Sequence, residues 1–135
     1  MGLDVANQLF GNFHFNWAGT SWCQQWCHEN GLPYPFIGWY SGDNSGDKCE
    51  LKGHPEARAW CAALEMRFPE IATLGKSLLV NPPANLWEYL HPYENTDSAS
   101  PANELSKREW ERRAVAAWYA ILRHGIEHGD TLEYW

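Results

Sequence analysis

Residues 106–129 read SKREWERRAVAAWYAILRHGIEHG, and this stretch predicts the longest helix of the chain. Apolar side chains recur along it every three or four residues, which places them on one continuous stripe. The members of that stripe are Trp110, Ala114, Ala117, Trp118, Ile121 and Leu122. Ser106 and Glu109 have the spacing of a capping box at the start of the helix, and Gly129 is expected to end it. A core is therefore expected to form around this helix.

Three further helices are expected before this one. They cover about residues 21–31, 55–68 and 69–80. Pro55 and Pro69 suit the first position of a helix, because the missing backbone N–H of proline has no helical partner there in any case. The stretch from residue 94 to residue 103 is poor in apolar residues. It is expected to be a loop that is too short to separate two domains.

A small sheet is expected beside the helices. Within residues 13–17, Phe and Trp side chains alternate with polar ones, as in a strand with one apolar face. Residues 36–40 form a second short apolar run, and residues 131–135 are expected to return as a terminal strand. We therefore predict an α+β fold, mostly helical, for a single globular domain over residues 1–135, with about four helices. Its sheet would be formed by the two chain ends and residues 36–40.

The charge and the aromatic content indicate a class of partner. The chain has a formal net charge of -7 at pH 7, which argues against a general affinity for nucleic-acid backbones or anionic membranes. It also carries 9 Trp, 6 Tyr and 5 Phe, and surplus aromatic residues are typical of binding surfaces. We therefore expect a protein partner, a basic one in particular. The same aromatic surface would serve a homo-oligomer equally well.

The sequence also bears on the compartment. No apolar run is long enough for a transmembrane helix, and the opening residues 1–4 lack the basic and apolar regions of a signal peptide. We therefore expect a cytoplasmic protein without a membrane partner. Stable disulfides are rare in that reducing compartment, so the cysteines are expected as thiols or as metal ligands.

All four cysteines lie between residues 23 and 61, with two histidines among them. The six residues are Cys23, Cys27, His28, Cys49, His54 and Cys61. Tetrahedral zinc takes four thiolate or imidazole ligands, often in short-spaced pairs. Cys23 and Cys27 would form one pair, and Cys49 with Cys61 or His54 the other. Yet three of the cysteines fall on apolar helix faces, where cysteine packs as a small hydrophobe. Core thiols without a cofactor are favoured, and a structural zinc site and disulfides are the alternatives.

An acidic loop at residues 43–47 has some features of a calcium site. Asp43, Ser45 and Asp47 alternate as in an EF-hand, but Lys48 replaces the required glycine and the glutamate of the twelfth position is missing. A solvated turn explains this composition better. Two aromatic residues precede the loop, so we predict a recognition surface here. Its residues are Trp39, Tyr40, Asp43 and Asp47.

Residues 124–128 read HGIEH, which matches the H-x-x-E-H pattern of inverted zinc proteases. On a helix, His124 and His128 would face one side, with Glu127 nearby as a base. His14 would be a further ligand if the two chain ends lie side by side. However, the helix dipole favours histidine in a last helical turn anyway, and no downstream ligand helix is expected. His124, His128 and His14 are therefore kept only as an alternative metal site.

No other sequence motif indicates a particular reaction. The sequence has no Gly-rich phosphate loop, no nucleophile elbow and no paired-carboxylate pattern. A basic run on the last predicted helix is expected on its outer, solvated face. Its members are Lys107, Arg108, Arg112 and Arg113.

Short stretches of the chain resemble a known group of proteins. They are the opening MGLDV (1–5), the aromatic and Asn-rich residues 13–17, the WYSGDN loop (39–44) and the closing HGDTLEYW (128–135). Together they resemble small uncharacterised proteins of bacteriophages and bacteria that begin with a Met-Gly-x-Asp-Val stretch. The resemblance implies a phage-related or bacterial setting and supplies no catalytic residue.

Two functions from different classes follow from these patterns. In the first, this is a small acidic, aromatic-rich, non-enzymatic binding protein, as in a phage or mobile-element accessory factor that inhibits a host defence or nuclease complex. In the second, it is a small zinc-binding protein or a metal-dependent hydrolase that uses the Cys/His cluster or the His124/His128 pair. The lack of a catalytic motif favours the first.

Overall fold

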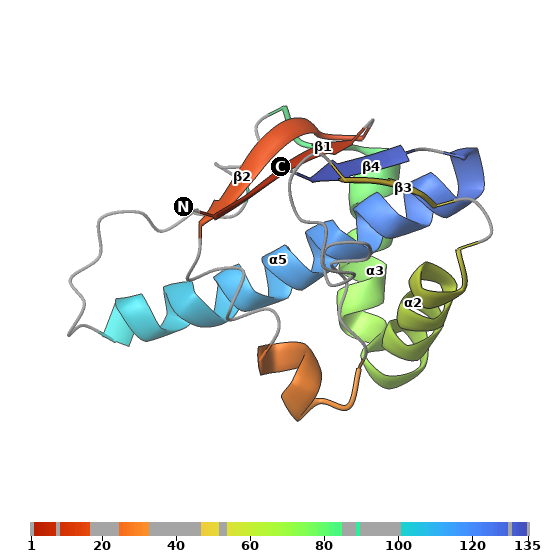
Figure 1. Ribbon diagram of the computed structural model, residues 1–135. Coiled ribbons are helices and arrows are strands. Elements are labelled where there is room, and N and C mark those ends of the chain that lie inside the picture. Colours follow the sequence, from red (N-terminus) through yellow and green to blue (C-terminus); the bar gives the residue numbers. More distant parts are fainter. Residues whose placement is uncertain are drawn as a thin grey trace.

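The computed structural model describes residues 2–7, 9–16, 25–32, 47–51, 54–84, 89, 101–129 and 131–134, with side chains at residues 9–11, 25–32, 51, 54–84, 89 and 112–129. Its elements are β1 (Gly2–Asn7), β2 (Gly11–Asn16), β3 (Asp47–Glu50), α2 (Pro55–Arg67), α3 (Pro69–Val80), α5 (Pro101–His128) and β4 (Thr131–Tyr134), as Figure 1 shows. Residues 25–29 are also helical.

Helix α5 is the centre of the molecule. Every residue from Ala114 to Ala120 is fully buried, with an exposed fraction of 0%. This run spans almost two helical turns, so neighbouring elements surround the helix on all sides there. Helix α3 crosses α5, and α2 lies beside the crossing (Figure 1). The predicted apolar stripe is confirmed as core from Ala114 to Leu122.

The crossing of α3 and α5 depends on a glycine. A Cβ added at Gly75 would collide with the ring of Tyr119 and would lie 3.0 Å from the carbonyl oxygen of Ala116. Gly75 therefore lets the two helix backbones approach more closely than any other residue would allow. No helix in the described part of the chain combines the length and apolar character that a membrane crossing needs.

Phe68 turns the chain from α2 into α3. Its N–H donates to the carbonyl of Leu64 at 2.8 Å, and its own carbonyl accepts from the N–H groups of Ile71 and Ala72, both at 3.1 Å. One residue thus closes α2 and opens α3. Pro69 is the first residue of α3, as predicted, because proline in that position removes no helical hydrogen bond.

The strands form one antiparallel sheet in the order β2-β1-β4-β3. Strands β1 and β2 make a hairpin, and Gly11 opens β2 with a φ of 74°, a conformation that favours glycine. Strand β4 follows α5 through Gly129, whose φ is 77°. The first and last described strands are therefore neighbours in one sheet, which lies above α5 in Figure 1.

The predicted α+β fold class is wrong for the packed body of the protein. Its buried core comes from α2, α3, α5 and the helical residues 25–29, together with Leu32 and Leu51 beside them. Where side chains are described, this body is all-helical and contains no strand. The physical reason is that α5 buries its whole circumference over two turns, and helices supply the described partners for that surface. The sheet is present as backbone pairing beside this body.

Two predicted boundaries also differ from those in the structure. The middle segment of the sheet is β3, whereas residues 36–40 lie outside the described residues. Helix α5 begins at Pro101, so Ser106 lies inside the helix and cannot form the predicted cap. Pro101 supplies the same start signal as the prolines of α2 and α3, and this shortens the predicted loop at residues 94–103.

Candidate functional site

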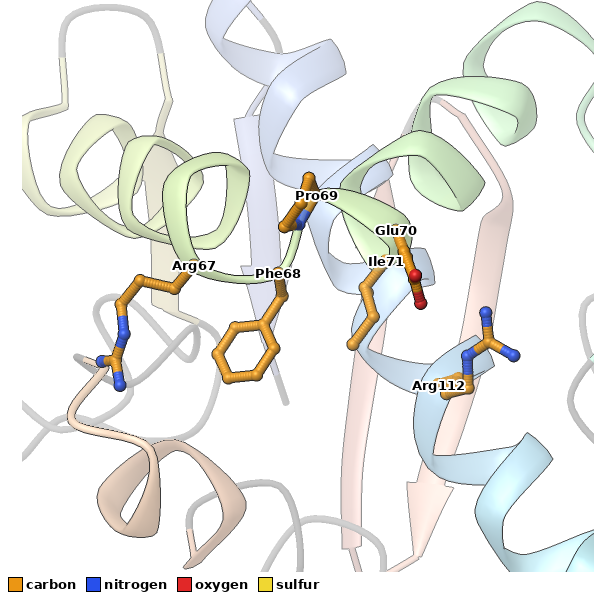
Figure 2. A pocket seen from close by; sticks show the side chains of 6 residues that line it. All are labelled: Arg67, Phe68, Pro69, Glu70, Ile71 and Arg112. Atoms are coloured by element: carbon orange, nitrogen blue, oxygen red, sulfur yellow. The ribbon is translucent and has the colours of Figure 1, made fainter.

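The corner between α2 and α3 borders a hollow of about 420 Å³ that faces α5, shown in Figure 2. We call it the corner hollow. It is lined by Arg67, Phe68, Pro69, Glu70, Ile71 and Arg112. Among these residues Ile71 is the most buried, with 9% of its surface exposed; Phe68 is half-buried, and the other four are exposed. The hollow is therefore an open surface depression with an apolar floor.

Three elements place its side chains. Phe68 and Ile71 belong to the turn and to the first helical turn of α3, and their side chains point to the same side in Figure 2. Arg67 ends α2, and Arg112 comes from α5 far along the chain. The two guanidinium groups lie at opposite ends of the apolar floor (Figure 2). Glu70 is the acidic residue in the first turn of α3, where a carboxylate is favoured by the helix dipole.

The Arg67 side chain is held in place by its neighbours. Its Nη1 donates to the carbonyl oxygen of Asn30, and its guanidinium lies 5.7 Å from the centre of the Phe68 ring. A Cβ at Gly31 would lie only 3.1 Å from Arg67 Nη1. Gly31 also has a φ of 67°, which suits glycine at the end of a helical segment. Arg67 therefore joins the end of the 25–29 segment to the corner of α2 and α3.

The floor of the hollow is supported from the same side. The rings of Trp26 and Phe68 lie 5.2 Å apart with an interplanar angle of 48°, a favourable tilted contact. The Asn30 side chain donates to the carbonyl of Trp26 at 2.8 Å and so closes the helical residues 25–29. The Phe68 ring is thereby held by two neighbours, the Trp26 ring and the Arg67 guanidinium.

A second polar group lies between α2 and α5. The Tyr119 hydroxyl donates to Glu65 Oε1 at 2.6 Å. Arg123 approaches Glu65 at 3.8 Å and Glu127 at 3.0 Å. Burial, and then the hydrogen bond to Glu65, raise the pKa of Tyr119 above its ordinary value of 10.0. Tyr119 therefore stays neutral and acts as a hydrogen-bond donor to the carboxylate.

The cysteines are not brought together as a metal site within the described residues. Cys27 and Cys61 are buried thiols outside any disulfide. Burial raises the pKa of the Cys61 thiol from 9.0 to about 12, and the thiol rather than the zinc-binding thiolate is its stable form. Cys23 lies outside the described residues, and Cys49 sits in β3 opposite Leu132 with no side chain described.

The two histidines of the cluster also lie apart from any complete ligand set. His28 is exposed, and the Nδ1 atom of His54 is buried without a hydrogen-bond partner. In the part of the chain that the structure describes, no group of three or more His, Cys, Asp or Glu side chains could hold a metal ion.

His124 and His128 are brought together as predicted, with their ring centres 4.3 Å apart. The remaining parts of the predicted site are elsewhere. Glu127 is paired with Arg123 at 3.0 Å. His14 pairs with Asp4 in the sheet, whereas α5 enters β4 at Thr131, which lies towards the other end of the strands. From the register, that end is about four residues, or roughly 13 Å, away along the strand.

The predicted recognition surface falls mostly outside the described residues. Trp39, Tyr40 and Asp43 are not among them, and Asp47 opens β3 opposite Tyr134. The basic run is only partly as predicted. Arg113 donates to the carbonyl of Tyr89 at 2.9 Å and lies 4.9 Å from its ring centre. Arg112 lines the corner hollow, and the side chains of residues 107 and 108 are not described.

The residues of the corner hollow were missed by sequence reasoning. The signal was present in part, because Arg67, Phe68 and Pro69 mark an abrupt junction between two helices. No sequence pattern indicated that Arg112 belongs to this hollow, because it reaches the corner of α2 and α3 only through the way α5 packs there. Comparisons with family models, with curated proteins and with solved structures found no match to this chain.

Proposed function

We propose that this is a non-enzymatic binding protein that holds a partner protein at the corner hollow. The observation that carries the proposal is the composition of that hollow, an apolar floor of Phe68 and Ile71 between two guanidinium groups. Phenylalanine and arginine are both enriched in protein interfaces. The set has the chemistry of an anchor site and offers no nucleophile.

The support of the floor strengthens this proposal. Trp26 and Arg67 hold the Phe68 ring before any partner arrives. A preorganised site loses less conformational entropy on binding, so more of the contact energy is available for affinity. The hollow is also open, which suits a side chain presented by a folded partner or a short segment of one.

The setting of this function is part of the proposal. The resemblance to small phage and bacterial proteins supports a phage-related or bacterial setting. In that setting, the acidity and the aromatic surplus of the chain support an accessory factor that inhibits a host defence or nuclease complex. Action in the cytoplasm agrees with the thiols of Cys27 and Cys61. A second copy of the chain is the alternative partner that the test must separate from a foreign protein.

The test compares two charge reversals of equal size. Arg112→Glu changes the corner hollow, and Arg58→Glu changes an exposed arginine on the same molecule that lies outside it. Arg58 is nine residues before Arg67 on α2, about 13 Å along the helix axis. Each tagged protein, after its melting temperature is checked, is used to capture partners from bacterial lysate, and the stoichiometry is measured.

We expect the wild-type protein and Arg58→Glu to retain the same partner in a fixed ratio, and Arg112→Glu to lose it. Capture that is equal for all three proteins would contradict the proposal, as would the absence of any stoichiometric partner. A dimer of this chain that is lost only in Arg112→Glu would replace the foreign partner by a second copy.

A further inference from the structure

The charge at the corner hollow differs in sign from the charge of the chain. The whole sequence has a formal net charge of -7. The hollow is lined by two arginines and one glutamate, so the formal charge of its lining is +1. A basic partner is expected from the chain as a whole, whereas this site presents positive charge around an apolar floor. Local charge decides which groups fit a site, because exposed charges beyond about 10 Å are screened.

The shape of the arginine side chains also suits the binding of carboxylates. A guanidinium group has five N–H donors in a rigid fork. The Asn30 carbonyl accepts a hydrogen bond from Arg67 Nη1, which anchors one nitrogen of the group. The other nitrogens carry donors that suit a carboxylate, and the contact with Phe68 keeps the group beside the floor.

We infer that the corner hollow takes an acidic segment of a partner protein in which one large apolar side chain lies next to carboxylates. This inference rests on the proposed function and names the chemistry of the partner. The apolar side chain packs on Phe68 and Ile71. The carboxylates on either side of it pair with Arg67 and Arg112, which stand at opposite ends of the floor. Glu70 lies on the Arg112 side of the floor in Figure 2, so it disfavours a segment with more than one carboxylate at that end.

The test selects binding peptides from a library of random sequences, so that no peptide composition is assumed beforehand. A display library of random short peptides is selected on the full-length protein and then depleted on Arg112→Glu, with Arg58→Glu as the matched variant that should not deplete it. Enriched peptides are synthesised, and their affinities for the three proteins are measured by fluorescence anisotropy at low and high salt. Amide NMR shifts locate where each peptide binds.

We expect enriched peptides to share Asp or Glu next to Phe, Leu, Ile or Trp. Their affinity should fall about tenfold or more in Arg112→Glu and stay within about twofold in Arg58→Glu, and it should fall as salt rises. Amide shifts should centre on residues 67–71. Replacing the acidic residues of a peptide by Lys should abolish its binding.

Other outcomes separate the inference from the proposed function. Peptides that shift residues 67–71 but are basic or uncharged would overturn the acidic segment and leave the binding function in place. Peptides that bind elsewhere, or a selection that enriches none, would overturn both. Self-association of the wild-type protein that Arg112→Glu abolishes would also overturn the inference, since the occupant would then be a second copy.

Discussion

The space beside Gly125 is filled by the side chain of Leu51, which is 1% exposed. A Cβ added at Gly125 would collide with the end of that side chain and lie 2.9 Å from its Cβ and 3.0 Å from its Cγ. The glycine between the two histidines of HGIEH is therefore explained by packing. This removes part of the reason for regarding the motif as a site.

Gly125→Ala should destabilise the protein even though alanine is the better helix former. We expect a loss of about 1–3 kcal/mol in the free energy of unfolding, because overpacking outweighs the gain of up to about 1 kcal/mol in helix propensity. Urea unfolding measures the change. In Leu51→Ala the same substitution should have a smaller effect, because the obstructing side chain is gone. A wild-type background in which Gly125→Ala is neutral would contradict the packing explanation.

Cys61 and Tyr119 should make the fold sensitive to alkaline pH. Both groups have a raised pKa in the folded protein, so their contribution is fully present below about pH 9 and is lost as pH rises towards the folded values. Between pH 9 and 12 the unfolded thiol ionises while the folded thiol does not. The free energy of unfolding should then fall by up to about 1.4 kcal/mol per pH unit for each such group.

Urea unfolding at a series of pH values checks this dependence. Cys61→Ala and Tyr119→Phe each remove one titrating group and should each flatten the decline above pH 9. The control is Tyr119→Phe at pH 7, where it reports only the lost hydrogen bond to Glu65. A wild-type stability that stays constant to pH 11 would show that neither group is shifted.

At the scale of elements, two contacts tie the segment around the helical residues 25–29 to the corner of α2 and α3. Arg67 reaches the Asn30 carbonyl, and the Trp26 ring meets Phe68. Gly31 provides the left-handed turn that brings Asn30 to Arg67. The corner hollow therefore depends on a segment outside the three long helices.

Gly31→Ala should loosen this segment without unfolding the protein. Alanine is strained at a φ of 67°, and its Cβ would press on Arg67. We expect a loss of about 1 kcal/mol in stability and faster amide hydrogen exchange at residues 26–32. Gly31→Asn should be milder, because asparagine tolerates the left-handed region better. Equal exchange rates in all three proteins would argue against this link.

The sequence predicted those parts of the molecule that local patterns determine. The prolines at residues 55 and 69 mark the starts of α2 and α3, and the apolar stripe of α5 marks the core. Strand β3 was missed because Asp47–Glu50 is mostly charged, and its pairing with β4 depends on backbone hydrogen bonds. The corner hollow could not be found because Arg112 reaches it only through the crossing of α5. The all-helical core was missed because the burial of α5 on every side is a tertiary property.

At the scale of the whole molecule, β4 holds the sheet together. Glu133 pairs with Ala6 of β1 and with Lys48 of β3, whereas β2 lies at an edge of the sheet and pairs, among the described strands, with β1 alone. Loss of pairing in β4 would therefore separate β3 from the β1–β2 hairpin.

Glu133→Pro should be more damaging than Asn12→Pro. Every N–H of a central strand points towards a neighbouring strand, so proline at Glu133 removes a ladder N–H, whereas Asn12 lies in an edge strand with a partner on one side. We expect Glu133→Pro to abolish amide protection in β3 and to lower the melting temperature more than Asn12→Pro does. Hydrogen exchange of residues 47–50 is the measurement. Retained protection of β3 in Glu133→Pro would contradict the central position of β4.

The late position of α5 and β4 in the chain has a consequence for synthesis. Both the helix around which α2 and α3 pack and the strand that joins the sheet lie beyond residue 100. While the ribosome is still translating them, the earlier segments have no core on which to fold. The apolar faces of α2 and α3 are thus exposed on the nascent chain until α5 has left the exit tunnel, and this interval is when chaperones or aggregation would act on the protein.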